Sequence, residues 1–221
     1  MPTDFKEPRF ASAILTVPAT AGLVGMPVAT LQSWVGQRHS RPQVVTRRAP
    51  LKRGWPSIPL VGLAEAAALR GLVDLGLPRS EIYAVVKHLR EHFGSPFPFA
   101  DERLVTDGRL AYVLEGVDSA YRVATKQHVF VEAVRDYLKP IVFADDHYPT
   151  AYRVPDMDGV VIDPRFNAGR WTFERSKVPL FAVAGALQAG EPTVEVAEMY
   201  RLDLDEVGLV ERHLERVAEA A

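Results

Sequence analysis

The chain has 221 residues, of which 48% are hydrophobic and 24% charged, a composition that excludes wholesale disorder. It contains no cysteine, which excludes disulfides, Cys-based zinc sites and thiol catalysis. Net charge is only −2, yet no Asp or Glu occurs from Pro8 to Ala64. This stretch carries seven basic residues: Arg9, Arg38, Arg41, Arg47, Arg48, Lys52 and Arg53. Such a segment favours a surface that binds a polyanion, and the alternative is an ordinary solvated surface.

The first predicted elements are two short helices joined by a turn. Thr16 is a suitable N-cap for a helix with Pro18 in its first turn, and Gly25 breaks that helix. Pro27 opens a second helix that ends at Gly36. This pattern predicts a helix-turn-helix motif.

Helical periodicity divides these two helices into inner and outer faces. The predicted inward positions are Ala21, Val24, Val28, Leu31, Trp34 and Val35. On the second helix, Thr30, Gln32 and Ser33 then face outward, where they can reach base edges or phosphates of DNA.

Residues 38–59 follow with most of the basic side chains. Val44–Arg48 is a β-prone run, and a turn around Lys52 and Arg53 comes next. We predict a β-wing with cations near its tip, and the alternative is a disordered basic loop. The predicted DNA contacts of this segment are Arg38, Arg41, Arg47, Arg48, Lys52 and Arg53.

Two further helices are expected in residues 60–94. The first runs from about Leu63 to Leu75 and stops at Gly76, and Pro78 opens the second. The apolar face of the second helix consists of Ile82, Val85, Val86, Leu89 and Phe93, and Gly94 ends it.

The rest of the chain alternates short extended runs with helices. After a Pro- and Phe-rich link at 95–100, the predicted elements are strands within 104–125 with a turn at Asp107-Gly108, a helix over His128–Leu138, a strand over Ile141–Phe143, a linker over Tyr148–Pro155, a strand over Val160–Ile162, an extended run over Arg170–Phe173 and helices within 179–221. Thr193 and Asp203 are the expected N-caps of the last two helices. The predicted class is mainly α with small β elements (α+β), in three parts: 1–94, 95–155 and 156–221.

The N-terminal run Leu15–Trp34 and the later Leu75–Ile82 resemble the winged helix of MerR-type regulators. MerR-type proteins carry an Arg-Tyr pair where this chain has Gln32 and Ser33. They also continue with a long dimerising helix, which Pro96 and Pro98 prevent here. The resemblance implies DNA binding and transcription regulation, while the missing long helix and the absence of cysteine argue against metal-sensing activation.

The C-terminal third resembles the domain of unknown function family 433. The matching segments are Val161–Arg165, Gly169-Arg170, Val178-Pro179, Ala189–Tyr200 and Leu204–Val207. The chain departs from that family at Trp171, where the family has Pro, and at Arg175–Lys177, where it has Gly-Thr-Arg. The combined layout resembles a VapB-type antitoxin of a type II toxin–antitoxin system. That likeness implies a PIN-type ribonuclease toxin as partner and an operator that the antitoxin binds as a repressor.

A short C-terminal stretch has the composition of an interface hot spot, because arginines alternate with aromatic residues there. The expected toxin-binding residues are Arg165, Arg170, Trp171, Phe173, Arg175 and Lys177. The alternative is a structural hairpin whose arginines pair with nearby acids. We also expect a homodimer, formed through residues 60–150.

Two clusters suggest an enzyme. His88, Glu91 and His92 match a His-x-x-Glu-His metal pattern, but no third ligand can be identified. Asp145-Asp146-His147 is more typical of a solvated turn. We therefore expect no enzyme, no catalytic residue, no metal and no cofactor.

With no apolar run near ~18 residues and no signal-peptide pattern, a cytoplasmic location without membrane contact is expected. Alternatives to the antitoxin are a stand-alone regulator whose residues 95–155 bind a small effector, and an enzyme built on the histidine pair.

Overall fold

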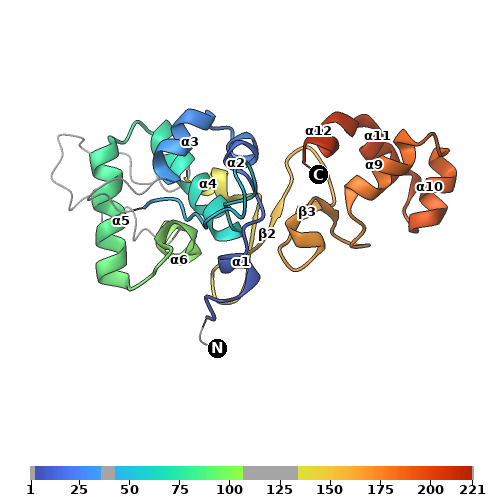
Figure 1. Ribbon diagram of the computed structural model, residues 1–221. Coiled ribbons are helices and arrows are strands. Elements are labelled where there is room, and N and C mark those ends of the chain that lie inside the picture. The colour runs from blue at the N-terminus through green and yellow to red at the C-terminus, as the bar shows by residue number, and fades with distance from the viewer. Residues whose placement is uncertain (1–2, 36–42, 107–133, 221) are drawn as a thin grey trace. The chain divides into compact units, whose positions relative to one another are not determined.

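The computed structural model describes residues 3–35, 43–106 and 134–220, and it divides into two compact units, residues 1–150 and 151–221 (Figure 1). It is mainly helical with four short antiparallel strands, so the predicted α+β class is confirmed. Its first unit contains α1 (Pro8–Ala11), α2 (Val17–Leu23), α3 (Val28–Val35), α4 (Leu60–Asp74), α5 (Arg79–Phe93), the 3-10 turn η1 (Pro98–Ala100), α6 (Glu102–Thr106) and β1 (Ile141–Phe143).

The predicted pair of short helices, α2 and α3, is present. Thr16 caps α2, because its hydroxyl accepts a hydrogen bond from the Ala19 amide at 3.2 Å. Gly25 takes a φ of +65° and turns the chain toward α3, which only glycine does at little cost. Both predictions are confirmed.

Helix α4 occupies the centre of the first unit. From Leu60 to Leu69 every residue is buried, and α5 contributes the fully buried Ile82, Val85, Val86 and Leu89. Two predicted core positions are wrong: Val28 is 43% exposed and Phe93 is 39% exposed. Val28 is the first residue of α3 and Phe93 is the last of α5, and these helix ends extend beyond the core.

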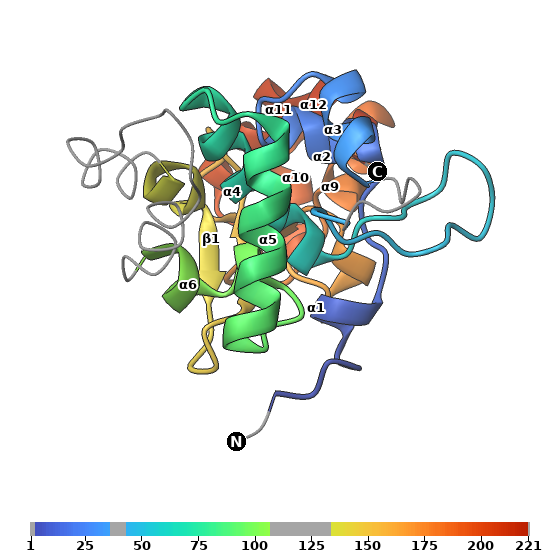
Figure 2. The same ribbon diagram turned by 90° about the vertical axis from the view of Figure 1, so that its left-hand side faces the viewer.

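The segment from 43 to 59 has a defined path but no strand, so the β-strand part of the predicted wing is wrong. One backbone hydrogen bond joins the two sides of this loop, from the Arg48 amide to the Ser57 carbonyl at 2.7 Å. Pro50 and Pro56 lack the amide hydrogens that a longer ladder needs. We call residues 46–57 the wing, and Figure 2 shows it as the cyan loop that extends away from the helices.

The middle of the chain contains two further corrections. Leu104 to Thr106 belong to helix α6 and not to a strand, while the predicted strands and turn within 107–125 lie outside the described residues. The predicted helix is helical over 134–138, its described part, and β1 is confirmed.

The predicted linker after Tyr148 is wrong, because Pro149–Arg153 form strand β2. A turn through His147, at a φ of +65°, folds the chain back after β1, and the Ala144 amide donates to the Tyr148 carbonyl at 3.0 Å. Local composition suggests a linker there, whereas pairing with neighbouring strands stabilises an extended strand.

The boundary between the units falls within β2, and the strands are hydrogen-bonded in the order β1-β2-β3-β4. In the second unit Tyr152 of β2 faces Ile162 of β3, and Val161 of β3 faces Thr172 of β4. The remaining elements are β3 (Val160–Ile162), the 3-10 turn η3 (Asn167–Gly169), β4 (Thr172–Phe173), α9 (Leu180–Gln188), α10 (Thr193–Tyr200), α11 (Leu204–Arg212) and α12 (Leu214–Glu219).

The four C-terminal helices pack around Val183, Val196, Val207 and Val210, each fully buried. Asp203 caps α11 in a capping box with Glu206, as predicted. The predicted cap at Thr193 is wrong, since Thr193 is already helical and Pro192 takes the N-cap position. None of the described helices is both long and apolar enough to cross a membrane.

Candidate functional site

The outer face of α3 presents fewer polar groups than the sequence suggests. The Ser33 hydroxyl donates to the Thr30 carbonyl at 2.6 Å and accepts from Arg79 Nη2 at 2.5 Å. Thr30 itself is half-buried, whereas Gln32 is exposed. Gln32 is therefore the polar side chain of α3 that is best placed to reach a ligand.

Arg79 is a cation of this region that the sequence did not reveal. Its guanidinium lies over the Trp34 ring at 4.4 Å, and Trp34 also contacts the Tyr83 ring at 5.1 Å. The exposed Arg79 thus fixes the start of α5 against the last turn of α3, where a positive charge suits the helix dipole. Its distance from α3 in the sequence hides this role.

The cations of the wing are of two kinds: one is bonded to the protein backbone, and the others are exposed to a ligand. Arg48 donates from Nη2 and Nε to the Phe10 carbonyl, at 2.8 and 3.2 Å, and so ties the wing to α1. Arg47, Lys52 and Arg53 are exposed, and no carboxylate of the described residues pairs with them. Arg38 and Arg41, also predicted to contact DNA, lie outside the described residues.

A buried carboxyl group holds the base of the wing. Glu65 of α4 is fully buried, and its Oε2 accepts the Thr46 amide at 2.6 Å. Burial raises the pKa of Glu65 to about 7, against the opposing effects of the Thr46 hydrogen bonds and the charges of Arg90 and Arg48. A Cβ added to Gly62, one turn earlier, would lie 2.4 Å from the Thr46 carbonyl oxygen, so helix and wing base are in close contact.

Arg9 is not available to a ligand, although it belongs to the acid-free stretch. It binds Asp146 with Nη1 at 3.0 Å and Nη2 at 2.5 Å, and it pairs with Glu7 at 2.8 Å. Burial raises the pKa of Asp146, but hydrogen bonds from Arg9 and the Tyr148 amide outweigh it and lower that pKa overall. The Asp145-Asp146-His147 turn therefore anchors the N-terminal segment.

The candidate metal pattern on α5 forms a pair and not a cluster. The His88 and His92 rings stack at 3.7 Å, and His92 Nδ1 lies 3.2 Å from the His88 carbonyl oxygen. Within the described ranges, no three His, Asp or Glu side chains converge in the way that a metal site requires.

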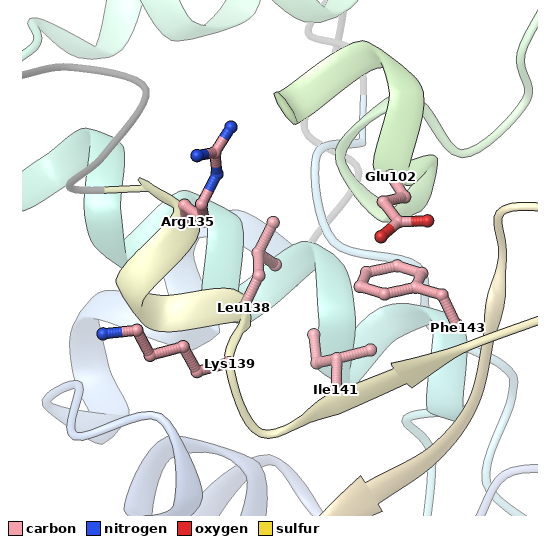
Figure 3. Close-up of a pocket in the computed structure, with 6 residues that line it drawn as sticks. All are labelled: Glu102, Arg135, Leu138, Lys139, Ile141 and Phe143. Atoms are coloured by element: carbon pink, nitrogen blue, oxygen red, sulfur yellow. The ribbon is translucent and has the colours of Figure 1, made fainter. Parts of the chain in front are cut away.

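A hollow of about 370 Å³ lies in the region where the alternative hypothesis places an effector (Figure 3). Leu138, Ile141 and Phe143 supply its apolar lining. Its two cations, Arg135 and Lys139, extend in different directions in the figure, and Lys139 pairs with Asp136 at 2.7 Å. Glu102 completes the lining, so the hollow combines apolar surface with charged side chains.

In the second unit, two of the predicted toxin-binding arginines are paired with acids. Arg165 binds the buried Asp163 with Nη2 at 2.6 Å and Nε at 3.0 Å. Arg175 Nη2 lies 2.7 Å from Asp203 and 3.1 Å from Glu206. For these two residues the structure agrees with the alternative of a structural hairpin.

The other predicted toxin-binding residues differ among themselves. Trp171 and Phe173 are only 9% and 1% exposed, which makes them core residues and leaves little of them for a partner to touch. Arg170 and Lys177 are exposed and lie over aromatic rings, Arg170 at 5.0 Å from Phe181 and Lys177 at 4.6 Å from Phe166. Phe181, which the sequence reasoning missed, is 38% exposed.

The three tryptophan side chains differ in exposure, which composition does not reveal. Trp34 lies in the core at 2% exposure, as predicted, and Trp171 is also buried. Trp55, in contrast, is 48% exposed on the wing. It was missed because nothing in its local sequence indicates exposure.

The fold and these surfaces define a two-unit protein with a basic wing on one unit and aromatic-backed cations on the other. The crystal structure of Rv2018 from Mycobacterium tuberculosis has a similar fold, with a TM-score of 0.70 and 26% identity, over 91% of this chain and 99% of that one. A protein of the same organism named "Putative antitoxin VapB45" is 31% identical over 91% of this chain and 93% of its own. The chain belongs to the family of this VapB antitoxin. No family model matches the chain, so the likeness to family 433 stays a prediction.

Proposed function

We propose that this chain is an antitoxin that neutralises a PIN-type ribonuclease toxin and represses its own operon by binding operator DNA. Membership of the VapB family supports the antitoxin role. The DNA-binding role is argued from the first unit, and the toxin-binding role from the second.

The observation that carries the DNA assignment is the wing. Arg47, Lys52 and Arg53 are exposed on the wing, which lies within the acid-free stretch from Pro8 to Ala64. Thr46 and Arg48 hold the base of the wing against α4 and α1. Phosphate groups supply the negative charges that such a wing binds, and Gln32 on α3 is available to read a base edge.

The test is a mobility-shift titration against salt, with duplexes from the region upstream of the chain's own reading frame. Each phosphate contact contributes roughly 0.9 to the slope of log K against log salt, so Arg47→Ala with Arg53→Ala lowers it by about two units. Lys87→Ala with Lys139→Ala is the matched control, because both lysines are exposed but pair with acids. A slope that is the same in both double variants contradicts the assignment.

The toxin-binding surface is assigned to the second unit. PIN-type ribonucleases hold metal ions with a cluster of carboxylates, and Arg170 and Lys177 supply exposed cations backed by Phe181 and Phe166. Arg beside aromatic rings is a common make-up of interface hot spots. Arg165 and Arg175 contribute less, because their charges are already paired.

A homodimer formed through residues 60–150 fits the operator role. One helix-turn-helix covers a single half-site, and two-fold dimers place two of them about one helical turn apart. Light scattering of the protein, free and bound to its operator, tests this, and a monomer in both states contradicts it.

A stand-alone regulator is the second candidate, and the hollow around Phe143 favours it. The two candidates differ in genomic context, since a PIN-type reading frame beside the gene supports the antitoxin.

A further inference from the structure

The tip of the wing carries apolar side chains that the protein does not use for packing. Leu51 is 87% exposed, more than any other large hydrophobic residue in the described part of the chain. Trp55, four residues later, is 48% exposed. Both residues belong to the turn over residues 51–55, and apolar surface rimmed by polar groups is typical of an interaction site.

The charged residues near Leu51 in the sequence are all basic. Lys52 and Arg53 follow it directly, Arg47 precedes it by four residues, and no acid occurs between Pro8 and Ala64. An apolar tip among cations matches a ligand that combines negative charge with flat apolar surface. Duplex DNA offers both, as phosphates along the backbone and as base faces between the steps.

Hydrogen bonds hold both the base and the tip of the wing. Its base is held by the Glu65 bond to the Thr46 amide at 2.6 Å and by the Arg48 bond to Phe10 at 2.8 Å. At its tip the Trp55 amide donates to the Lys52 carbonyl at 3.1 Å, and Gly54 supports the turn at a φ of +84°. Lys52 Nζ lies 5.3 Å from the centre of the Trp55 ring, which orders the side chains beside Leu51.

We propose that Leu51 is a wedge that enters the minor groove of duplex DNA and partly unstacks one base step, while Trp55 packs beside it and the wing cations bind the flanking phosphates. This inference rests on the proposed DNA-binding role of the wing and adds a mechanism of specificity. Unstacking is easiest at flexible pyrimidine–purine steps such as TA and CA, so the wedge selects sequence by deformability, without hydrogen bonds to bases.

The test combines base-stacking fluorescence with DNA bending. Overlapping 30-base-pair duplexes from the region upstream of the gene carry 2-aminopurine at a TA or CA step and a dye at each end. The wild type raises the 2-aminopurine emission and shortens the end-to-end distance. Leu51→Ala abolishes both signals and weakens binding about tenfold at an unchanged salt slope. Leu51→Met, which keeps an apolar wedge, restores both. Because Leu51 is exposed, these variants leave the fold intact, which thermal unfolding verifies.

The outcomes separate the wedge from the function on which it rests. If the wild type binds these duplexes with a salt slope that Arg47→Ala lowers, but without emission change or bending, the wedge is wrong and the DNA-binding role stands. If it binds no duplex, both fail. An anionic membrane also combines negative charge with apolar surface, and vesicles of phosphatidylserine and phosphatidylcholine test this alternative. If Leu51 is needed for binding to the vesicles and the protein does not unstack DNA, the proposal is overturned in favour of a lipid surface.

Discussion

The cations of the wing and those of residues 165–177 differ in what surrounds them. On the wing, Arg47, Lys52 and Arg53 point into solvent on a segment without acids. In the second unit, Arg165 pairs with the buried Asp163, and Arg175 bridges Asp203 and Glu206. Similar densities of arginine therefore provide a charged surface in one unit and mainly local stabilisation in the other.

The comparison shows that a basic residue is available to a partner only when its own fold leaves it unpaired. Within the second unit, Arg170 and Lys177 lie over aromatic rings and resemble the wing cations more than their neighbours. Within the first unit, Arg9 and Arg48 are structural, through Asp146 and the Phe10 carbonyl. The experiments below separate available from structural charges, from the largest expected effect to the smallest.

The largest effect is expected at the base of the wing. Gly62→Ala places a Cβ 2.4 Å from the Thr46 carbonyl oxygen and 2.9 Å from Ile58 Cγ2, and backbone cannot yield cheaply. We expect a loss of about 1–3 kcal/mol in the free energy of unfolding, and weaker DNA binding because the wing shifts. The matched control is Gly185→Ala in α9, where nothing lies within 4 Å of the new Cβ and helix propensity gains up to ~1 kcal/mol. Urea unfolding that finds both changes equally tolerated contradicts the close packing of helix and wing.

Charge reversal in the second unit tests the available cations there. Arg170→Glu with Lys177→Glu weakens toxin binding by about 2 kcal/mol, roughly thirtyfold, because the new carboxylates repel an acidic metal site. Arg165→Gln with Arg175→Gln is the control and has a smaller effect on binding. Calorimetry with the purified ribonuclease from the neighbouring reading frame measures both. Point variants are preferable to truncation, because β2 spans the unit boundary. Equal loss in the two double variants removes the distinction between paired and available arginines.

Glu65 makes the stability of the first unit depend on pH. Burial raises its pKa from 4.5 to about 7 in the folded protein, so the folded state holds a proton that the unfolded state releases. The contribution of Glu65 to stability is therefore complete below pH ~4.5 and is lost as pH rises toward 7, by on the order of 1–3 kcal/mol in total.

The variant Glu65→Gln isolates this effect, because its amide oxygen still accepts the Thr46 amide hydrogen. We expect the variant to gain stability relative to the wild type between pH 5 and 7 and to keep a constant advantage above pH 7.5. Denaturant titrations at several pH values measure the difference. A difference that does not vary with pH would falsify the assignment of a protonated Glu65.

The smallest effect is expected where a charge is purely structural. Asp203→Ala removes the capping box of α11 and one partner of Arg175, and costs about 1 kcal/mol of stability. DNA binding stays unchanged. Asp205→Ala, which removes an exposed acid from the same turn without a cap, is the comparison. If both variants lose the same stability, the capping box is not the source of the effect.

The sequence by itself determined those features that depend on local chemistry. The α+β class, the turn at Gly25, the cap at Thr16, the helix breaks at Gly76 and Gly94 and the cap at Asp203 follow from propensity and spacing, which act within a few residues. The acid-free stretch was equally visible, because charge is a property of composition.

Only the tertiary structure decided which groups are available. The Ser33 hydroxyl accepts a hydrogen bond from Arg79, 46 residues later, and Arg48 donates to the Phe10 carbonyl, 38 residues earlier. Trp171 and Phe173 are buried, Leu51 and Trp55 are exposed, and residues 149–153 form a strand. Burial, ion pairing and strand pairing depend on residues far apart in the chain, and no local pattern records which of them meet.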